Sequence, residues 1–274
     1  MKVDSNKTLP IVASTLVLGL FMAPVAQGAL VGHWTFNDDT ANDVTANGAN
    51  GAVSGGATFV DTPGNNRGIS LDGVDGVVDF GLPSHLDFSG TGPDSGVSPF
   101  TLSAWVAIDD QAGGNFHNVF GSEGNYALFY EHSGGGAARV RSTVNTGGGL
   151  DIRETGPQSV LPFGSYHHYL VTKGGAASGF DPVLLYQDGQ RVATGGGRQP
   201  MAASNGNSIL IGLGSGNFFD ATYDELGIWD EYMNDAQVLA LFNAGPTLIP
   251  EPSSIALIGL GLLVMNGLRR RIRA

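Results

Sequence analysis

Apolar and polar residues alternate along much of the chain between residues 30 and 229, a pattern that predicts β-strands. The clearest example is residues 100–108. There Phe100, Leu102, Ala104, Val106 and Ile108 share one face, and Thr101, Ser103, Trp105 and Ala107 share the other. Further strands are expected at residues 30–36, 69–73, 76–80, 126–130, 138–141, 167–172, 183–187, 191–193, 209–211 and 221–229.

Turn and cap residues divide these strands from one another. Asp188-Gly189 between two strands is a strong hairpin signal. One helix is expected near the end of the domain, with Asn234 as its N-cap, Gln237 three residues later, and a stop at Gly245. Many short strands at near-regular spacing predict an all-β, two-sheet antiparallel jelly-roll sandwich with one short C-terminal helix, over residues 29–245.

The first 28 residues have the parts of a secretory signal peptide. Lys2 and Lys7 precede an apolar stretch at residues 9–22, and small residues follow it. We expect residues 1–28 to be the signal peptide, with cleavage between Gly28 and Ala29.

The last segment, residues 246–274, differs from everything between the two ends. It contains Pro250-Glu251-Pro252, an apolar run at residues 255–268, and arginines at 269, 270, 271 and 273. As a helix the run spans about 21 Å, less than the roughly 30 Å hydrocarbon core of a bilayer. The arginines can snorkel to headgroups, extend the span, and hold the C-terminus on the cytoplasmic side. A C-terminal single transmembrane segment is therefore expected.

This order of parts resembles a PEP-CTERM sorting segment. That resemblance implies a protein exported by a Gram-negative bacterium that makes extracellular polysaccharide, with processing by an exosortase. The expected location is the cell envelope or the exterior, with initial anchoring in the inner membrane by the C-terminal helix.

A second resemblance covers the body of the chain. Its landmarks are residues 31–37, 43–51, 100–106, 185–189 and 223–229, followed by the short helix. In this order they resemble a LamG-like jelly roll of the concanavalin A-like lectin/glucanase architecture. The resemblance implies binding of glycans or of protein ligands, and some relatives are hydrolases.

Charge excludes one class of partner. Between the two terminal segments the chain has 7 basic and 23 acidic residues, a net charge of −16. Such a surface repels the phosphates of nucleic acid, so DNA or RNA binding is not expected. The chain has no cysteine, which excludes a disulfide framework and thiolate chemistry.

The acidic residues show no pattern for hydrolysis. The Glu-x-Asp-x-x-Glu motif found in the resembling glucanases is absent, so we expect no enzyme activity. A structural calcium ion is a more credible use of the carboxylates, held by Asp38, Asp43 and Asp224 together with loop carbonyls. The alternative is that these aspartates form local turns and caps.

Sugar binding needs an exposed aromatic surface with polar neighbours. Trp105 is predicted on the outer face of its sheet, and Tyr130 and His117 are further candidates, with His117 expected in a loop. The alternative for Trp105 is a place in the core. The sequence thus favours a non-catalytic binding module for polysaccharide. A divergent glycan-active enzyme and a matrix-structural protein that binds other proteins remain as alternatives.

Overall fold

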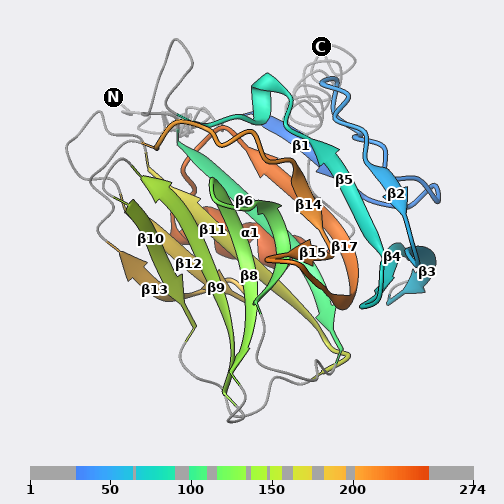
Figure 1. Cartoon of the computed structure of the whole chain (residues 1–274). Helices are drawn as coiled ribbons and strands as arrows, with labels where there is room; N and C mark the ends of the chain where they lie inside the picture. Colours follow the sequence, from blue (N-terminus) through green and yellow to red (C-terminus); the bar gives the residue numbers. More distant parts are fainter. Residues whose placement is uncertain are drawn as a thin grey trace, which may run out of the picture.

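The computed structural model describes residues 29–63, 66–89, 99–109, 116–133, 137–146, 149–155, 163–174, 182–195 and 201–246. Over these ranges the chain forms two packed antiparallel sheets with one short α-helix on one side (Figure 1), which confirms the predicted fold class. The predicted signal peptide with Gly28, the Pro250-Glu251-Pro252 motif and the predicted transmembrane segment lie outside the described residues. Within the described ranges, no helix has the length and apolar character needed to cross a membrane.

The first sheet has eight strands, in the order β13-β12-β11-β6-β17-β4-β3, and β1 also pairs with β17. We call it the eight-stranded sheet. Its strands are β1 (Leu30–Trp34), β3 (Thr58–Thr62), β4 (Asn66–Asp72), β6 (Phe100–Ile108), β11 (Tyr166–Lys173), β12 (Val183–Gln187), β13 (Gln190–Gly195) and β17 (Asp220–Trp229).

The second sheet has seven strands, in the order β10-β9-β8-β7-β14-β5-β2. We call it the seven-stranded sheet. Its strands are β2 (Ala52–Ser54), β5 (Val77–Gly81), β7 (Phe116–Ser122), β8 (Tyr126–Ser133), β9 (Ala137–Thr146), β10 (Gly149–Glu154) and β14 (Ile209–Ile211). The small hairpin β15 (Leu213–Gly214) and β16 (Asn217–Phe218), the 3₁₀ turn η1 (Ser84–Leu86) and the helix α1 (Asp235–Ala244) complete the described elements.

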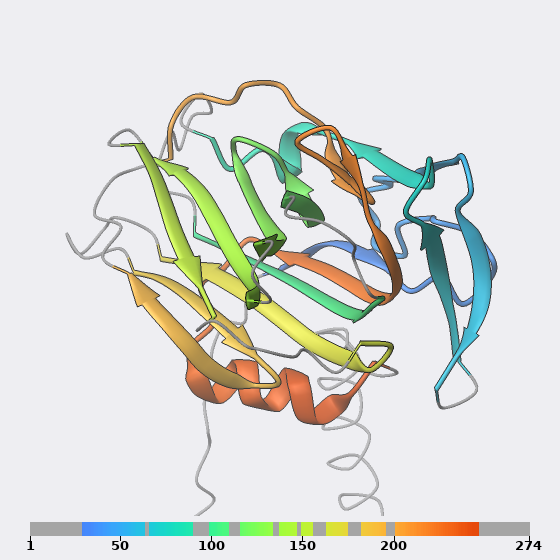
Figure 2. The ribbon, with the colours of Figure 1, turned by 60° about the horizontal axis from the view of Figure 1, so that its bottom comes forward.

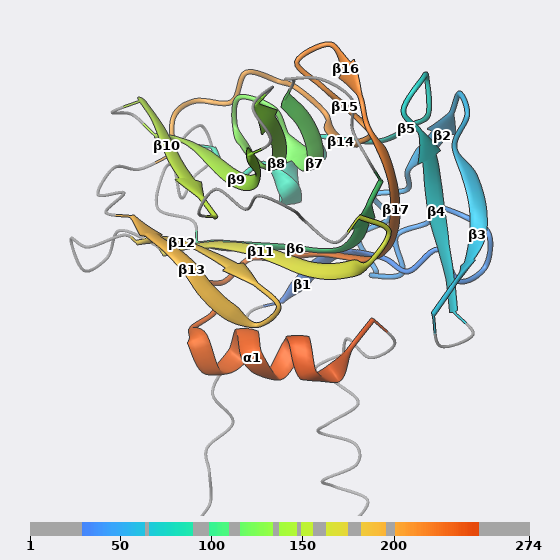
Figure 3. The ribbon, with the colours of Figure 1, turned by 90° about the horizontal axis from the view of Figure 1, so that it is seen from below.

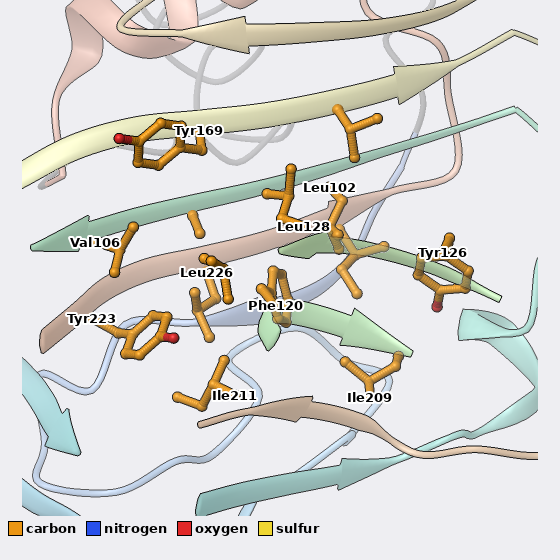
Figure 4. Close-up of a cluster of buried hydrophobic side chains, with 14 of the residues drawn as sticks. Leu102, Val106, Phe120, Tyr126, Leu128, Tyr169, Ile209, Ile211, Tyr223 and Leu226 are labelled. Carbon is orange, nitrogen blue, oxygen red and sulfur yellow. The ribbon is translucent and has the colours of Figure 1, made fainter. Parts of the chain in front are cut away.

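The core is the apolar layer between the two sheets. The five residues predicted to share the inner face of β6 are all buried in it. Figure 4 shows Leu102 from β6 beside Leu128 from the opposite sheet, and Val106 and Phe120 belong to the same buried cluster. Trp34 also lies between the sheets, 4.4 Å from the Phe80 ring centroid, and its indole N–H donates to the Ala49 carbonyl over 2.7 Å. The apolar positions of the alternating pattern on β6 are therefore the positions that face the opposite sheet.

Helix α1 covers the outer face of the eight-stranded sheet (Figure 2). It begins with the predicted capping box, in which the Asn234 side chain accepts from the backbone of Gln237 and the Gln237 side chain accepts from the backbone of Asn234. Val238 is buried in a second apolar cluster with Leu170 and Trp229 on the sheet. The helix thus removes a large part of this face from solvent.

Strand β17 changes partner at a bulge. Its first half pairs with β4, where Tyr223 faces Ile69, and its second half pairs with β1, where Leu226 faces Trp34. Both Tyr223 and Leu226 are buried in the core although they are three residues apart. The register with β6 shifts between these positions, and Glu225 has a φ of 47°, which non-glycine residues seldom adopt. The bulge separates the two strands that share this edge of β17.

Buried polar groups hold the bulge in place. The Glu225 carboxylate lies 2.6 Å from the His33 Nε2 atom on β1. The Asp224 carboxylate accepts hydrogen bonds from the Thr62 hydroxyl over 3.0 Å and from the Asn66 amide over 3.1 Å. The two adjacent carboxylates therefore tie β17 to its two successive partners.

Several strands were not predicted. Residues 52–54, 58–62, 116–122 and 149–154 form β2, β3, β7 and β10. The prediction that His117 lies in a loop is wrong, because it is the second residue of β7. The predicted first strand ends at Trp34 instead of residue 36, because Phe36 has a φ of 59° that interrupts the extended backbone.

Replacing Leu102 by Ala should destabilise the domain by about 2–5 kcal/mol, because it leaves a cavity between the two sheets. Replacing Val74 by Ala is the control: this side chain is 69% exposed, and the change should stay within about 0.5 kcal/mol. Urea unfolding followed by fluorescence measures both values. Equal effects for the two variants would contradict the assignment of the core.

Replacing Asp224 by Asn should stabilise the protein at alkaline pH. Burial and the neighbouring Glu225 raise the pKa of Asp224 to about 7, although Thr62 and Asn66 act against the shift. Because the native pKa lies above the ordinary value of 3.8, the protonated Asp224 carboxyl group contributes its full stabilisation below pH 3.8. This stabilisation is lost as the pH rises through 7.

The Asn variant carries no charge, so it should exceed the wild type by more than about 1 kcal/mol at pH 8 and match it at pH 4. Thermal or urea unfolding across this range gives the difference. A pH-independent difference between the two proteins would show that Asp224 is ionised throughout.

Candidate ligand-binding cleft

Two of the aromatic residues predicted to bind ligand are inside the sandwich. Tyr130 on β8 is fully buried, with its ring 5.6 Å from that of Phe219. His117 is buried as well: its Nδ1 atom lies 2.8 Å from the Phe218 carbonyl oxygen and its ring stacks on Phe219 at 5.3 Å. Burial lowers the pKa of His117. Neither ring faces solvent, so neither offers the exposed surface that the prediction required.

Trp105 lies on the outer face of the eight-stranded sheet, as predicted. Helix α1 covers it there: the Phe242 ring stacks on the indole with centroids 5.5 Å apart and planes 14° apart, and His168 lies 5.1 Å away. Trp105 therefore packs the helix against the sheet and is half-buried there, outside the two apolar clusters of the core.

The three predicted calcium ligands make separate hydrogen bonds. Asp38 accepts from the backbone N–H and the hydroxyl of Thr40, a local turn on the surface. Each oxygen of the buried Asp43 carboxylate accepts two hydrogen bonds: Oδ1 from the backbone of His33 and Thr45, Oδ2 from the Thr45 hydroxyl and the backbone of Ala49. Asp224 belongs to the cluster at the bulge.

Among the described residues, no group of three or more His, Asp or Glu side chains is placed to hold a metal ion. A calcium site at Asp38, Asp43 and Asp224 stays a prediction.

A cleft of about 230 Å³ lies on the outer face of the seven-stranded sheet. This face points away from helix α1, which lies on the far side of the other sheet (Figure 3). Strands β7 to β10, the β7–β8 turn and the β15–β16 turn line it, with the residues Phe116, Glu123, Gly124, Phe129, Arg141, Thr143, Leu150, Ile152 and Ser215.

The wall of the cleft presents apolar side chains to solvent. Phe116 is 38% exposed, Leu150 57% and Ile152 38%, whereas Phe129 is buried beneath them. Most large apolar side chains of a sandwich point inward, so three exposed ones around a single depression make this cleft a candidate binding surface.

One ring of the cleft is held in place by charge. The guanidinium carbon of Arg141 lies 5.1 Å from the Phe116 ring centroid, within the range of a cation–π interaction. Arg141 in turn contacts Glu131 at 3.1 Å and Glu154 at 3.0 Å. The guanidinium that packs on the Phe116 ring is thus itself bound to two carboxylates.

The rim of the cleft is tied together by Glu123 on the β7–β8 turn. Its carboxylate accepts from the Ser215 backbone N–H over 2.9 Å and from the Ser215 hydroxyl over 2.7 Å. Backbone and side-chain donors on the turn of the β15–β16 hairpin therefore fix that hairpin against the β7–β8 turn.

The sequence reasoning missed this site. A signal for it was present at residues 149–154, where exposed Leu150 and Ile152 alternate with Asp151 and Arg153. The run of glycines at 147–149 directly before this alternation is typical of a loop, which weakens the strand signal. Nothing in the local sequence pairs Phe116 with residues of β10.

The calcium prediction can be tested by chelation. If calcium occupies the predicted site, the melting temperature should fall by several degrees with excess EDTA and recover with millimolar calcium, because the bound ion stabilises the native state. Differential scanning calorimetry measures both conditions. Equal melting temperatures would reject the site and leave the Asp43 carboxylate with its four hydrogen bonds as a purely local turn.

Comparisons with known structures support the fold. The binding domain of Paraclostridial Mosquitocidal Protein 1 matches with a TM-score of 0.64 and 17% identity, over 79% of this chain and 52% of that one. The binding domain of Botulinum Neurotoxin DC matches with a TM-score of 0.58 and 11% identity, over 79% and 51%. This chain spans about half the length of these two toxin domains.

A third structure is matched over nearly its whole length. Domain 4 of AbnA, a GH43 extracellular arabinanase from Geobacillus stearothermophilus, in complex with arabinotriose, matches with a TM-score of 0.53 and 18% identity. The match covers 78% of this chain and 98% of that one. No curated protein matches the sequence significantly.

Family models match both the body of the chain and its C-terminal segment. The PEP-CTERM protein-sorting motif matches residues 248–271, which confirms the sorting segment of an exported protein. The model of the concanavalin A-like lectin/glucanases superfamily matches residues 83–239, more than half of the sequence. The chain belongs to the concanavalin A-like lectin/glucanases superfamily and carries a C-terminal PEP-CTERM sorting motif.

Proposed function

We propose that this protein is an exported, non-catalytic binding module that holds extracellular polysaccharide in the cleft on the seven-stranded sheet. Its tail would be anchored in the inner membrane and processed by an exosortase. The observation that carries the proposal is the group of exposed apolar side chains, Phe116, Leu150 and Ile152, around one depression of the free sheet face.

The chemistry of the cleft fits a sugar. The C–H faces of pyranose rings pack on aromatic and aliphatic side chains, and their hydroxyls need polar partners nearby. Phe116 supplies an exposed ring, and Thr143 brings a hydroxyl into the lining. Because Arg141 already holds the ring, a ligand need not order it on binding, which lowers the entropic cost.

The position of the chain ends supports this use of the cleft. The Ala29 carbonyl accepts from the backbone of Asp230, directly after β17, and the Pro246 carbonyl accepts from the Asn66 side chain on β4. Both ends of the described domain thus lie beside the eight-stranded sheet. The cleft lies on the seven-stranded sheet and faces away from the eight-stranded one (Figure 3). A tail held in a membrane would leave the cleft accessible.

The carboxylates beside the cleft support binding more than hydrolysis. A glycosidase needs a carboxylic acid with a raised pKa to protonate the leaving group. Burial alone would raise the pKa of Glu154, but hydrogen bonds from Arg141 and Arg139 outweigh it and the pKa is lowered. Glu131 is bound to the same two arginines.

The structures of similar fold are consistent with this role. Domain 4 of the arabinanase was solved in complex with arabinotriose, so the architecture holds an oligosaccharide in another protein. The toxin domains are named as binding domains.

Replacing Phe116 by Ala should weaken polysaccharide binding at least ten-fold, about 1.4 kcal/mol, because the variant lacks the exposed ring. Biolayer interferometry of the full-length protein in mild detergent, over immobilised polysaccharides that include the host's own, measures the dissociation constant. The matched control is Phe163→Ala, a phenylalanine of nearly equal exposure, 37%, that does not line the cleft.

The control should bind like the wild type. Equal losses in both variants, or unchanged binding in Phe116→Ala, would place the ligand elsewhere. Failure of the wild type to bind any polysaccharide would reject the proposed function and favour a structural role among matrix proteins.

A further inference from the structure

The charges beside the cleft form a balanced network. Arg139 contacts Glu131 at 3.4 Å and Glu154 at 2.8 Å, and Arg141 contacts the same two carboxylates at 3.1 and 3.0 Å. We call these four residues the ion-pair quartet. Each arginine bridges both glutamates, so its positive charge is neutralised within the protein.

The remaining charge at the cleft is negative. Glu123 on the rim accepts two hydrogen bonds from Ser215 but faces no cation among the contacts of the described residues. Together with the quartet it gives this surface one more carboxylate than guanidinium groups. The body around it has a net charge of −16, so an anionic polymer would approach against an unfavourable potential.

The contact surface is mainly apolar. Phe116, Leu150 and Ile152 stand exposed over the buried Phe129, and Thr143 and Ser215 are the hydroxyl-bearing side chains of the lining. The Ser215 hydroxyl already donates to Glu123. A ligand therefore gains more from C–H or methyl groups than from hydroxyls or carboxylates.

We propose that the cleft selects neutral polysaccharides whose sugars present apolar groups, such as deoxy or O-acetyl substituents, and rejects uronic-acid polymers. This inference rests on the proposed function and names its ligand class. The quartet supplies the selectivity, because it keeps the arginines from acting as an anion site.

The experiment compares neutral and anionic polymers with the full-length protein in mild detergent. The probes are an O-acetylated xylan, the same xylan after deacetylation, and polygalacturonate, each immobilised and measured at 20 and 300 mM NaCl. We expect the acetylated xylan to bind at least ten-fold tighter than polygalacturonate. Its dissociation constant should change less than two-fold between the two salt concentrations, because no net charge is neutralised. Deacetylation should weaken binding several-fold.

Two variants test the parts of the mechanism. Glu154→Gln removes one carboxylate from the quartet, so polygalacturonate should bind at least three-fold tighter at 20 mM NaCl, and 300 mM NaCl should abolish this gain. Leu150→Ala should weaken binding of the acetylated xylan about three-fold, whereas Val192→Ala, an exposed apolar residue on β13 outside the cleft lining, is the control.

The outcomes separate the two proposals. Tighter, salt-sensitive binding of polygalacturonate by the wild type would overturn the ligand class and leave polysaccharide binding standing. Binding that survives deacetylation unchanged would overturn the role of apolar substituents. Absence of binding to all three probes and to the host polysaccharide would reject the proposed function itself.

Discussion

Burial of apolar side chains between the two sheets determines where every other group in the domain can lie. Leu102 and Val106 from one sheet meet Phe120 and Leu128 from the other, and Trp34 closes on Phe80. Because side chains alternate along each strand, fixing the inner face also fixes which residues face outward. On β7 to β10, the residues between the inward-facing positions therefore lie on the outer face of the sheet.

The outer faces of the two sheets differ in how far they are covered by other elements. On the eight-stranded sheet, α1 packs Val238 and Phe242 over Leu170 and Trp105. On the seven-stranded sheet, the described residues place no helix over the cleft, and apolar side chains remain exposed there. Contiguous exposed apolar patches on a protein surface often mark interaction sites. This asymmetry is the main reason to place the function on the seven-stranded sheet.

Local signals in the sequence were enough for much of the fold. The strict alternation at residues 100–108 and the cap formed by Asn234 and Gln237 depend on neighbours in the chain, and both predictions were confirmed. Burial of Tyr130 was not foreseen, because a tyrosine in a strand can face either way until its sheet partners are known.

The cleft itself could not be read from the sequence. Phe116 comes near β10 only through the pairing of β7 with β8, β8 with β9, and β9 with β10. Likewise, the bulge at Asp224 and Glu225 depends on β1 and β4 meeting the same edge of β17. Both features arise from contacts between distant segments, which a pattern of nearby residues does not encode.

Hydrogen–deuterium exchange of the full-length protein, with and without saturating polysaccharide, shows directly whether ligand occupies the outer face of the seven-stranded sheet. If it does, exchange on binding becomes slower in β7, β10 and the β15–β16 hairpin and stays the same in α1. Protection confined to α1 and the outer face of the eight-stranded sheet would place the ligand on the opposite side of the sandwich.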